Sequence, residues 1–316
     1  MHGAMTAPCF RPPSCATVAS LPPQSLPQFS RRRRDVAFFA VLGTIGGCYV
    51  LLMVLLLVAN AAYTAPDHFI EVLNKPEIRY ALKLTLVSCT IAAVFSLWIG
   101  TALGYLLSRF RFRGKWIVDT LVDVPIVLPP LVLGLSLLIL FHLPIGGHRL
   151  EDLIQEGGRW VQDRLPSWAP DALRTAQIRI TYGVPAVILA QFSVACAFAI
   201  RTMRVTFDQI NPRAEQVART LGCSRGQAFT RITLPQASRG MLSAFTVAWA
   251  RSLGEFGPIL VFAGATRMRT EVLSTTVFLE LSVGNLEASV AVSLLMVAMA
   301  FLVLGVLRLV GGELGR

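Results

Sequence analysis

Long apolar runs dominate the hydrophobic pattern of this chain. Five stretches of about 20 residues or more carry no formal charge, namely 36–66, 84–108, 124–148, 180–200 and 288–307. An α-helix rises about 1.5 Å per residue, so each stretch is long enough to cross about 30 Å of hydrocarbon. A sixth stretch, 240–266, is equally apolar but contains Arg251 and Glu255. The pattern predicts an all-α, polytopic membrane protein with six transmembrane helices.

The composition supports this interpretation. Hydrophobic residues make up 54% of the 316 residues and charged residues 15%, against about 25% charged in a typical soluble domain. The mean hydropathy is +0.61. These values exclude a disordered chain and a collagen-like fibre. Buried helices of a large soluble domain would show polar faces at a 3.6-residue period, and these runs mostly lack them.

The distribution of positive charge predicts the orientation. With the N-terminus in the cytoplasm, six spans place eighteen of the 29 Lys and Arg residues in cytoplasmic segments and nine in outer segments. Cytoplasmic loops retain positive charge, so both termini are expected to be cytoplasmic. The same count accounts for the net charge of +11 without a nucleic-acid surface, and no nucleic-acid partner is expected.

The segments outside the spans differ in character. Residues 1–34 form a Pro-rich basic tail that is expected to be disordered and cytoplasmic, and residues 35–66 are the first transmembrane helix. The outer segment 144–181 is long, and 149–165 within it has the pattern of an amphipathic helix, either resting on the headgroups or contacting an external partner. No Cys or His spacing predicts a metal site, and no arrangement of residues predicts a catalytic site.

The cytoplasmic segment 203–240 contains two short helical patterns joined by a glycine. Pro212 suits the first turn of a helix that includes Glu215 and Ala218, and Gly222 can adopt the left-handed conformation that ends it. Ser224 is placed to cap a second helix, which Pro235 is expected to stop. Two short helices that project from a membrane at a tight turn predict a knob that docks into a partner protein.

The spacing in this segment resembles the EAA loop of binding-protein-dependent ABC importer permeases. That pattern is Glu-Ala-Ala, three residues, Gly, nine residues and Ile-x-Leu-Pro. Here Gln216, Val217 and Ala218 precede Gly222 at the right distance, and Ile232, Leu234 and Pro235 follow it. Gln and Val replace the usual Glu and Ala, and Glu215 precedes them by one residue, so whether Glu215 supplies the missing carboxylate is open.

Two further motifs resemble the molybdate, tungstate and sulfate branch of that family. They are Leu-Pro-Pro-Leu-Val-Leu-Gly at 128–134 and Arg-Ser-Leu-Gly-Glu-Phe-Gly at 251–257, within a permease core that the resemblance extends over 79–310. The resemblance implies a type I ABC importer fold, a homodimeric or pseudo-dimeric channel, two copies of an ATP-binding subunit docked on the EAA loops, and an extracytoplasmic oxyanion-binding protein. No Walker A pattern occurs in this sequence, so ATP-Mg is expected on the partner ATPase and no cofactor on this chain.

In chain order, the third span is 124–148 and the fifth is 240–266. The residues expected to line the translocation path or gate lie where Pro or Gly interrupts the helix in these two spans. They are Pro129, Pro130, Gly134, Arg251, Gly254, Glu255, Phe256 and Gly257. Backbone amides freed at such breaks can solvate an anion, whereas ordinary kinks and close helix packing are the alternative. Arg251 and Glu255 are four residues apart and are expected to pair, either as a structural ion pair or as part of the gate.

The sequence therefore predicts a permease of the bacterial cytoplasmic membrane that imports a tetrahedral oxyanion. Molybdate or tungstate is the first expectation, and sulfate or thiosulfate is the alternative. A secondary transporter driven by an ion gradient would show inverted repeats, and none is evident. A membrane scaffold or receptor would leave the EAA-like loop without a role.

Overall fold

The computed structural model describes residues 28–63, 66–145, 148–163 and 180–313, and these residues are almost entirely helical. The predicted all-α class is confirmed. The exception is a two-residue antiparallel ladder between β1 (Pro144–Ile145) and β2 (His148–Arg149). Most of the predicted N-terminal tail, residues 1–27, lies outside the described residues.

The first helix, α1 (Gln28–Tyr63), is longer at its N-terminal end than the sequence predicted. It includes residues 28–34, which were expected to belong to the disordered tail, and it ends before residue 66. Arg31–Arg34 account for the extension because arginine is a good helix former once a helix is nucleated by the apolar run that follows. The described residues fall into two units, one of residues 28–59 and one that begins at residue 60.

Within residues 60–316, the long helices α3 (Pro76–Arg109) and α8 (Val184–Gln209) form the principal helix pair. Small residues allow the close approach. A Cβ atom on Gly100 would lie 3.0 Å from the Cβ of Ala199, and one on Gly104 would lie 2.8 Å from the Cβ of Met203. Gly100 and Gly104 therefore form a small-xxx-small contact surface, the arrangement that packs helices within a membrane.

The third predicted span is not a single straight helix. It consists of α4 (Lys115–Val127) and α5 (Pro130–His142), whose axes differ by 114°. Pro129 and Pro130 stand at the break because a proline lacks the N–H that a continuing helix needs. The ladder β1–β2 and then α6 (Leu150–Asp163) follow, and α6 agrees with the predicted amphipathic helix.

The fifth predicted span is also broken. Its parts are α12 (Ser238–Leu253) and α13 (Gly257–Phe262), separated by non-helical residues 254–256. By length and composition, four of the described helices could each cross a membrane, and α4 and α5 together pass as a fifth span. The two parts of the remaining expected span, α12 and α13, are each too short to cross alone. The chain closes with α14 (Leu273–Ser282) and α15 (Leu286–Glu313).

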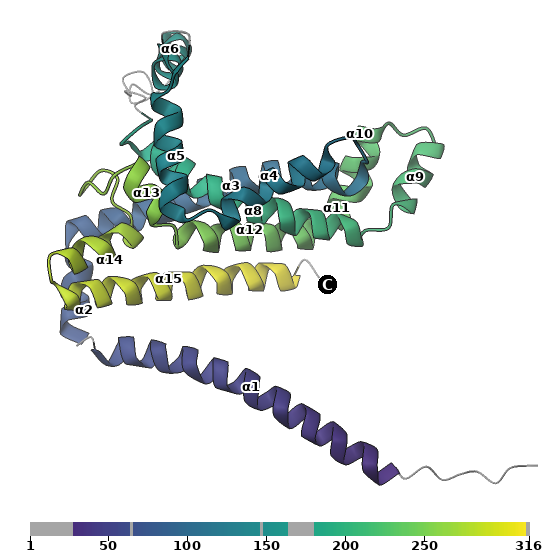
Figure 1. Ribbon diagram of the computed structural model, residues 1–316, viewed down its shortest axis with the longest axis horizontal. Coiled ribbons are helices and arrows are strands. Elements are labelled where there is room, and N and C mark those ends of the chain that lie inside the picture. The colour runs from purple at the N-terminus through teal and green to yellow at the C-terminus, as the bar shows by residue number, and fades with distance from the viewer. Residues whose placement is uncertain (1–27, 64–65, 146–147, 164–179, 314–316) are drawn as a thin grey trace, which may run out of the picture. The chain divides into compact units, whose positions relative to one another are not determined.

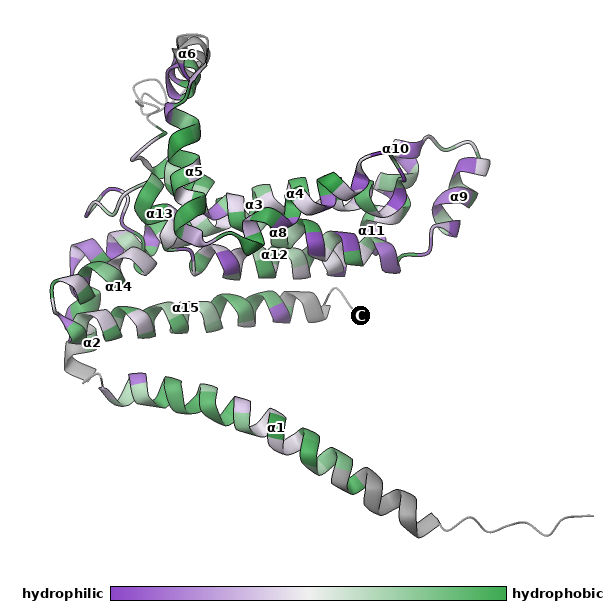
Figure 2. Ribbon diagram, in the orientation of Figure 1, coloured by the Kyte–Doolittle hydropathy of each residue, from purple (hydrophilic) through white to green (hydrophobic). Residues whose placement is uncertain are grey.

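Short helices lie at both ends of the bundle formed by α3, α8 and α12 (Figure 1). At one end are α9 (Arg213–Thr220), α10 (Arg225–Ala228), the π-helical turn η1 (Phe229–Thr233) and α11 (Leu234–Gln236). At the other end are α13, α14 and α2 (Pro66–Asn74). Figure 2 shows polar α9 at one end of the bundle, and strongly apolar α5 and α15.

Candidate functional site

The loop between α9 and α10 is a rigid turn. Gly222 has φ +91°, the left-handed conformation that the sequence predicted. The N–H of Cys223 donates to the carbonyl of Ala218 (3.1 Å) and the N–H of Gly222 to that of Arg219 (3.2 Å), so the turn is a Schellman motif. Ser224 then caps α10 reciprocally with Gln227. The predicted helix–glycine–helix unit is confirmed.

The two faces of α9 have different surroundings. Ala218 is buried, whereas Gln216, Val217 and Leu221 are exposed, with 57% of Val217 and 80% of Leu221 accessible. Val217 and Leu221 are four residues apart, so their side chains lie on the same face of the helix. The loop thus has an apolar outer surface, which we call the α9 knob and define as Val217 and Leu221.

Glu215 faces the bundle and not the α9 knob. Its Oε1 accepts a hydrogen bond from the hydroxyl of Tyr105 (2.5 Å), and its Oε2 accepts one from Thr233 (3.4 Å). The guanidinium of Arg109 lies 3.8 Å from Oε2. The Glu215 carboxylate therefore anchors α9 to α3 and η1.

The second half of the EAA-like pattern continues into α12. Ile232 and Leu234 are half-buried, and Pro235 is exposed in the first turn of α11. The expectation that Pro235 stops the helix is wrong, because Ala237 donates to the carbonyl of Thr233 and Met241 to that of Ala237. The wide π-helical turn before Pro235 tolerates the missing N–H, so the chain passes into α12 almost without interruption.

The two interrupted spans meet each other. A Cβ on Gly134 of α5 would lie 2.8 Å from the Cα of Pro258 in α13, and a Cβ on Gly257 would lie 2.9 Å from the Cβ of Pro130. The contact is reciprocal, because each glycine faces the backbone or ring of a residue on the other helix. The structure therefore brings together the two motifs that the sequence singled out separately.

Arg251 and Glu255 pair next to this contact. Arg251 Nη2 lies 2.8 Å from Glu255 Oε1, at a distance for an ion pair but without hydrogen-bond geometry. Only 1% of Glu255 is accessible, whereas 36% of the Arg251 side chain is, and the guanidinium lies over the ring of Phe198. The expected pairing is present, although Glu255 lies beyond the last residue of α12.

The non-helical residues 254–256 are held by α14. The hydroxyl of Ser274 donates to the carbonyl of Glu255 (2.7 Å), and the rings of Phe256 and Phe278 have centroids 5.0 Å apart. Gly254 is exposed at the break, whereas Gly257 is buried. The break is thus a fixed feature of the fold, with a charged pair on one side and an aromatic contact on the other.

The structure brings together two groups of charged residues that the sequence did not predict. The first joins α4 to α8: Arg201 makes two contacts with the Asp123 carboxylate, and Arg204 Nη1 lies 2.5 Å from Asp119. Asp119 and Asp123 are four apart on α4, and Arg201 and Arg204 are three apart on α8. This spacing places each pair on one helix face, which was the only signal available in the sequence.

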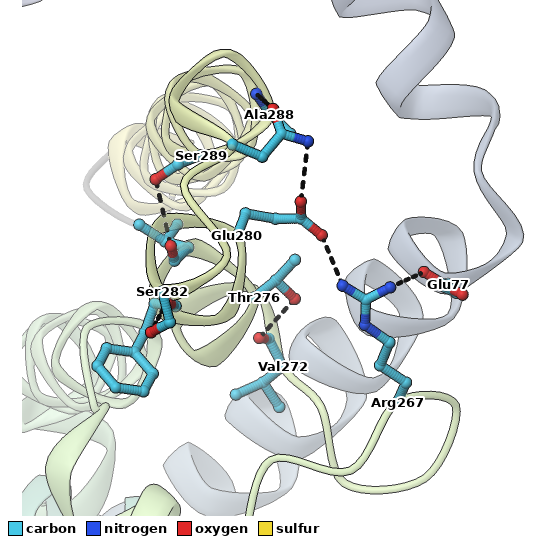
Figure 3. A network of polar contacts seen from close by, with 11 residues as sticks. Glu77, Arg267, Val272, Thr276, Glu280, Ser282, Ala288 and Ser289 are labelled. Carbon is cyan, nitrogen blue, oxygen red and sulfur yellow. Dashed lines mark hydrogen bonds and ion pairs between the residues drawn. The ribbon is translucent and has the colours of Figure 1, made fainter.

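The second group lies at the end of the bundle opposite the α9 knob. Arg267 donates to Glu77 (3.0 Å) and to Glu280 (2.9 Å), and so links α3 to α14 (Figure 3). Glu271 nearby is 1% accessible, and its Oε2 has no hydrogen-bond partner among the described residues. Burial raises the pKa of Glu271, and this effect outweighs the opposing contributions of Thr276 and Arg267.

Comparison with known proteins places these features in a family. Residues 96–312 match the family described as binding-protein-dependent transport system inner membrane component. The predicted core of 79–310 covers nearly the same region. Members of this family are membrane permease subunits and not themselves catalytic.

The similar curated proteins carry several names. The chain is 30% identical over 290 residues to the sulfate transport system permease protein CysT of Escherichia coli. The matched region covers 91% of this chain and 97% of CysT. It is 31% identical over 233 residues to the molybdate/tungstate permease WtpB of Thermococcus kodakarensis (74% and 80% covered). It is also 31% identical over 270 residues to the molybdenum permease ModB of Mycobacterium tuberculosis (85% and 92% covered).

A solved structure has the same fold. The bacterial alginate ABC transporter in complex with a periplasmic protein matches with a TM-score of 0.63 at 19% identity, over 92% of this chain and 97% of that one. This likeness covers 92% of the chain and not the coupling loop alone, and it confirms the type I importer fold that the sequence resemblance implied. The chain belongs to the family of binding-protein-dependent transport system inner membrane components.

Proposed function

We propose that this chain is the permease subunit of an ABC importer that carries a tetrahedral oxyanion across the cytoplasmic membrane. The observation that carries the proposal is the α9 knob, an apolar surface on a short polar helix whose turn is fixed by a Schellman motif. A rigid apolar projection at the end of a helix bundle has the form needed to enter a socket on another protein. Family membership supports the same assignment.

The α9 knob is the proposed docking surface for the ATP-binding subunit. Burying a side chain of the size of Val or Leu contributes about 1.5–3 kcal/mol, so Val217 and Leu221 together supply a substantial part of a docking energy. Gln216 lies beside them on the exposed side of α9. Glu215 and Ala218, also predicted for the coupling loop, act from the inner face by holding α9 against the bundle.

The ATP-binding subunit would supply the bound ATP-Mg and its hydrolysis. This sequence contains no Walker A pattern, so the chain relies on a partner for energy. We propose two copies of that partner, one for each chain of a permease homodimer. Exposed apolar residues lie on α4 and α5, among them Trp116, Leu121 and Leu131, as expected of helices that face lipid or a second permease chain.

Docking of an ATPase fixes the proposed orientation. The α9 knob then faces the cytoplasm of a bacterial cell, and the opposite end, with Arg267, Glu77 and Glu280, faces outward. This arrangement agrees with the excess of Lys and Arg in the segments assigned to the cytoplasm, with both termini on that side.

The contact between α5 and α13 is the proposed wall of the translocation path. Pro129, Pro130 and Gly134 contribute from one side and Gly254, Phe256 and Gly257 from the other. We propose that the Arg251 guanidinium neutralises Glu255, so that a buried carboxylate does not repel an anion passing the break.

For the transported anion, we propose a chemical class, the tetrahedral oxyanions, and not a single species. Similar permeases are named for sulfate, for molybdenum and for molybdate or tungstate, so the names do not support placing molybdate or tungstate ahead of sulfate. These anions share a tetrahedral shape and double negative charge. We propose that an extracytoplasmic binding protein selects among them, as the related alginate structure includes a periplasmic protein.

A pair of substitutions tests the docking surface. Leu221→Asp places a charge on the α9 knob, and Val283→Asp introduces the same charge at a site that is 76% accessible at the other end of the bundle. We expect the ATP-binding subunit to co-purify with the chain carrying Val283→Asp and to be lost with Leu221→Asp. Recovery of the ATP-binding subunit with both variants would overturn the docking assignment.

Reconstitution tests the transport function. The permease, its ATP-binding subunit and the binding protein are placed in liposomes, and uptake of labelled sulfate is measured with unlabelled molybdate and tungstate as competitors. We expect uptake that requires internal ATP and the binding protein, and the order of competition will name the substrate. Uptake that follows an imposed ion gradient without ATP would instead establish a secondary transporter.

A further inference from the structure

An apolar groove and a polar pocket adjoin at the end of the bundle opposite the α9 knob. The groove has a volume of about 650 Å³, and the described residues that line it are all apolar. The pocket has a volume of about 350 Å³ and is lined mostly by polar and charged side chains. We call the two together the amphipathic site.

Three pairs of consecutive residues are shared between the two cavities, because the first residue of each pair lines the groove and the second lines the pocket. They are Phe141 and His142, Ile154 and Gln155, and Ile180 and Thr181. Neighbouring Cα atoms are only 3.8 Å apart, so the groove and the pocket border each other along three separate segments. An apolar surface therefore passes directly into a polar one.

The segment 180–182, which precedes α8, fixes this border. The hydroxyl of Thr181 donates to Glu151 Oε2 (2.5 Å) and so ties α6 to the segment. Tyr182 has φ +57°, in the left-handed region that a bulky residue rarely adopts, and its N–H donates to the carbonyl of Phe262 (3.4 Å). Backbone in such a conformation is often found where a ligand binds.

Four charged side chains line the polar pocket, namely Arg149, Arg269, Glu151 and Asp152. Asp152 Oδ2 accepts a hydrogen bond from the backbone N–H of Arg149 (3.3 Å), and Thr181 donates to Glu151. Among the described residues, neither guanidinium forms a hydrogen bond or an ion pair, and the second oxygen of each carboxylate accepts no hydrogen bond. Opposite charges that share a pocket without pairing suit a ligand that carries both signs.

The amphipathic site lies at the boundary of the membrane. The apolar span in α8 begins at Val184, directly after the segment that lines the pocket. Along α8 the groove extends from Val184 to Phe192, about 12 Å at about 1.5 Å per residue. The pocket is therefore at the level of lipid headgroups, and the groove is at the depth of acyl chains.

We propose that the amphipathic site binds a phospholipid with an ethanolamine headgroup. Arg149 and Arg269 would hold the phosphate, because guanidinium groups match phosphate in charge and geometry. Glu151 and Asp152 would accept hydrogen bonds from the ammonium group, and an acyl chain would lie in the groove. The pocket volume equals about a dozen waters at about 30 Å³ each, which suits a phosphoethanolamine group.

The same charges disfavour the other common headgroups. A choline group has no N–H to donate to the two carboxylates, and a glycerol group has no positive charge to place beside them. The inference rests on the proposed function only for the leaflet, which would be the outer one. Because lipid binding is measured on the purified chain without ATP or transport, failure of this inference and failure of the proposed function give different results.

The test titrates the delipidated full-length chain in detergent with phosphatidylethanolamine, phosphatidylcholine or phosphatidylglycerol, and counts bound lipids by native mass spectrometry. We expect phosphatidylethanolamine to bind most tightly, and to lose about thirtyfold in affinity when Arg149→Gln and Arg269→Gln are combined. The matched control combines Arg111→Gln and Arg113→Gln, two exposed arginines of the loop between α3 and α4, and should bind as the unchanged chain does.

A second variant examines the carboxylates with both arginines in place. Glu151→Gln combined with Asp152→Asn removes the negative charges but keeps an oxygen to accept the bonds from Thr181 and from the N–H of Arg149. It should lower the affinity for phosphatidylethanolamine to that for phosphatidylcholine. Glu156→Gln, at an exposed position of α6 outside both cavities, is the control and should leave the preference intact.

A third variant examines the groove. Ile188→Trp fills it, whereas Val205→Trp adds the same side chain to an exposed site on α8, so only the first should weaken phosphatidylethanolamine binding. Equal affinity for the three lipids, or equal losses in the site and control variants, would overturn the proposal. So would competition by free phosphoethanolamine at the concentration of the lipid, which would assign the pocket to a soluble zwitterion.

One remaining outcome concerns the proposed extracytoplasmic binding protein. If the double arginine variant bound phosphatidylethanolamine normally but no longer bound that protein, the pocket would belong to the protein interface and the lipid assignment would be wrong. Normal binding of the protein together with the expected loss of lipid binding would support the lipid.

Discussion

The close contact between α5 and α13 leads to a quantitative prediction. Alanine at Gly134 would place its Cβ 2.8 Å from the Cα of Pro258 and 3.1 Å from the Cβ of Val261. Carbon atoms in contact prefer about 3.5–4.0 Å, so the helices must separate by about 0.7 Å at this point. Neither neighbour can rotate away, because one is backbone and the other is a Cβ atom fixed to it.

The expected cost follows from two opposing contributions. Overpacking of this kind costs about 1–3 kcal/mol, whereas replacing a glycine by alanine within a helix gains up to about 1 kcal/mol. Gly305→Ala in α15 measures the gain from replacing glycine by alanine alone, because nothing lies within 4 Å of its added Cβ. The difference in unfolding free energy between Gly134→Ala and Gly305→Ala should therefore be about 1–3 kcal/mol.

The assay is thermal unfolding of the purified chain in detergent, followed by tryptophan fluorescence. The difference corresponds to a midpoint lower by a few degrees for Gly134→Ala, since about 1 kcal/mol shifts the midpoint by about 2–4 °C in chains of 150–250 residues. Gly257→Ala should behave similarly, and combining it with Gly134→Ala should cost less than the sum, because one separation of the helices relieves both contacts. Equal midpoints for Gly134→Ala and Gly305→Ala would refute the reasoning.

Three further predictions concern charged residues. Arg251→Ala should reduce oxyanion uptake in liposomes more than the double change Arg251→Ala with Glu255→Gln, because the single change leaves a buried carboxylate without its ion-pair partner. Strictly additive losses in uptake and basal ATPase activity would show that the two residues act independently. Asp123→Arg should lower the thermal midpoint, because it places like charges between α4 and α8, and adding Arg201→Asp should restore the midpoint. A midpoint that the second change does not restore would show that the ion pair has no effect on stability. Burial raises the pKa of Glu271, so its contribution to stability is present below about pH 4.3 and is lost as pH rises through the folded-state pKa. Relative to Glu271→Gln, the wild-type midpoint should thus fall with increasing pH, and parallel pH profiles would contradict this assignment.

Local signals in the sequence were sufficient for the coupling loop. Gly222 and Ser224 form the predicted turn and cap because the bonds that fix them join residues five or fewer positions apart. The direction of Glu215 was not predictable, because its partner Tyr105 lies 110 residues earlier in the chain. Only the packing of α9 on α3 decides which side of α9 faces the bundle.

The geometry of the breaks in the third and fifth spans was likewise not predictable from local sequence. Pro129 and Pro130 predicted an interruption, but the 114° bend depends on where α5 finds a packing partner. That partner is α13, which begins more than a hundred residues later and meets Gly134 through Pro258. Counting apolar residues locates the spans, but composition alone does not distinguish a straight helix from two helices joined at a break.

The helix α12 connects the two parts of the proposed mechanism. Helix α11 joins the start of α12 to the π-helical turn that bonds to Glu215, and the last residue of α12 is followed by the break with Glu255. Its 16 residues extend about 24 Å, and a continuous hydrogen-bonded helix of this length transmits a push along its axis with little compression. Because Glu215 also bonds to Tyr105, movement of the α9 knob must either carry α3 with it or break that bond. We therefore expect the Glu215–Tyr105 contact to determine whether force from a docked ATPase reaches the break through α12 alone or through α3 and α12 together.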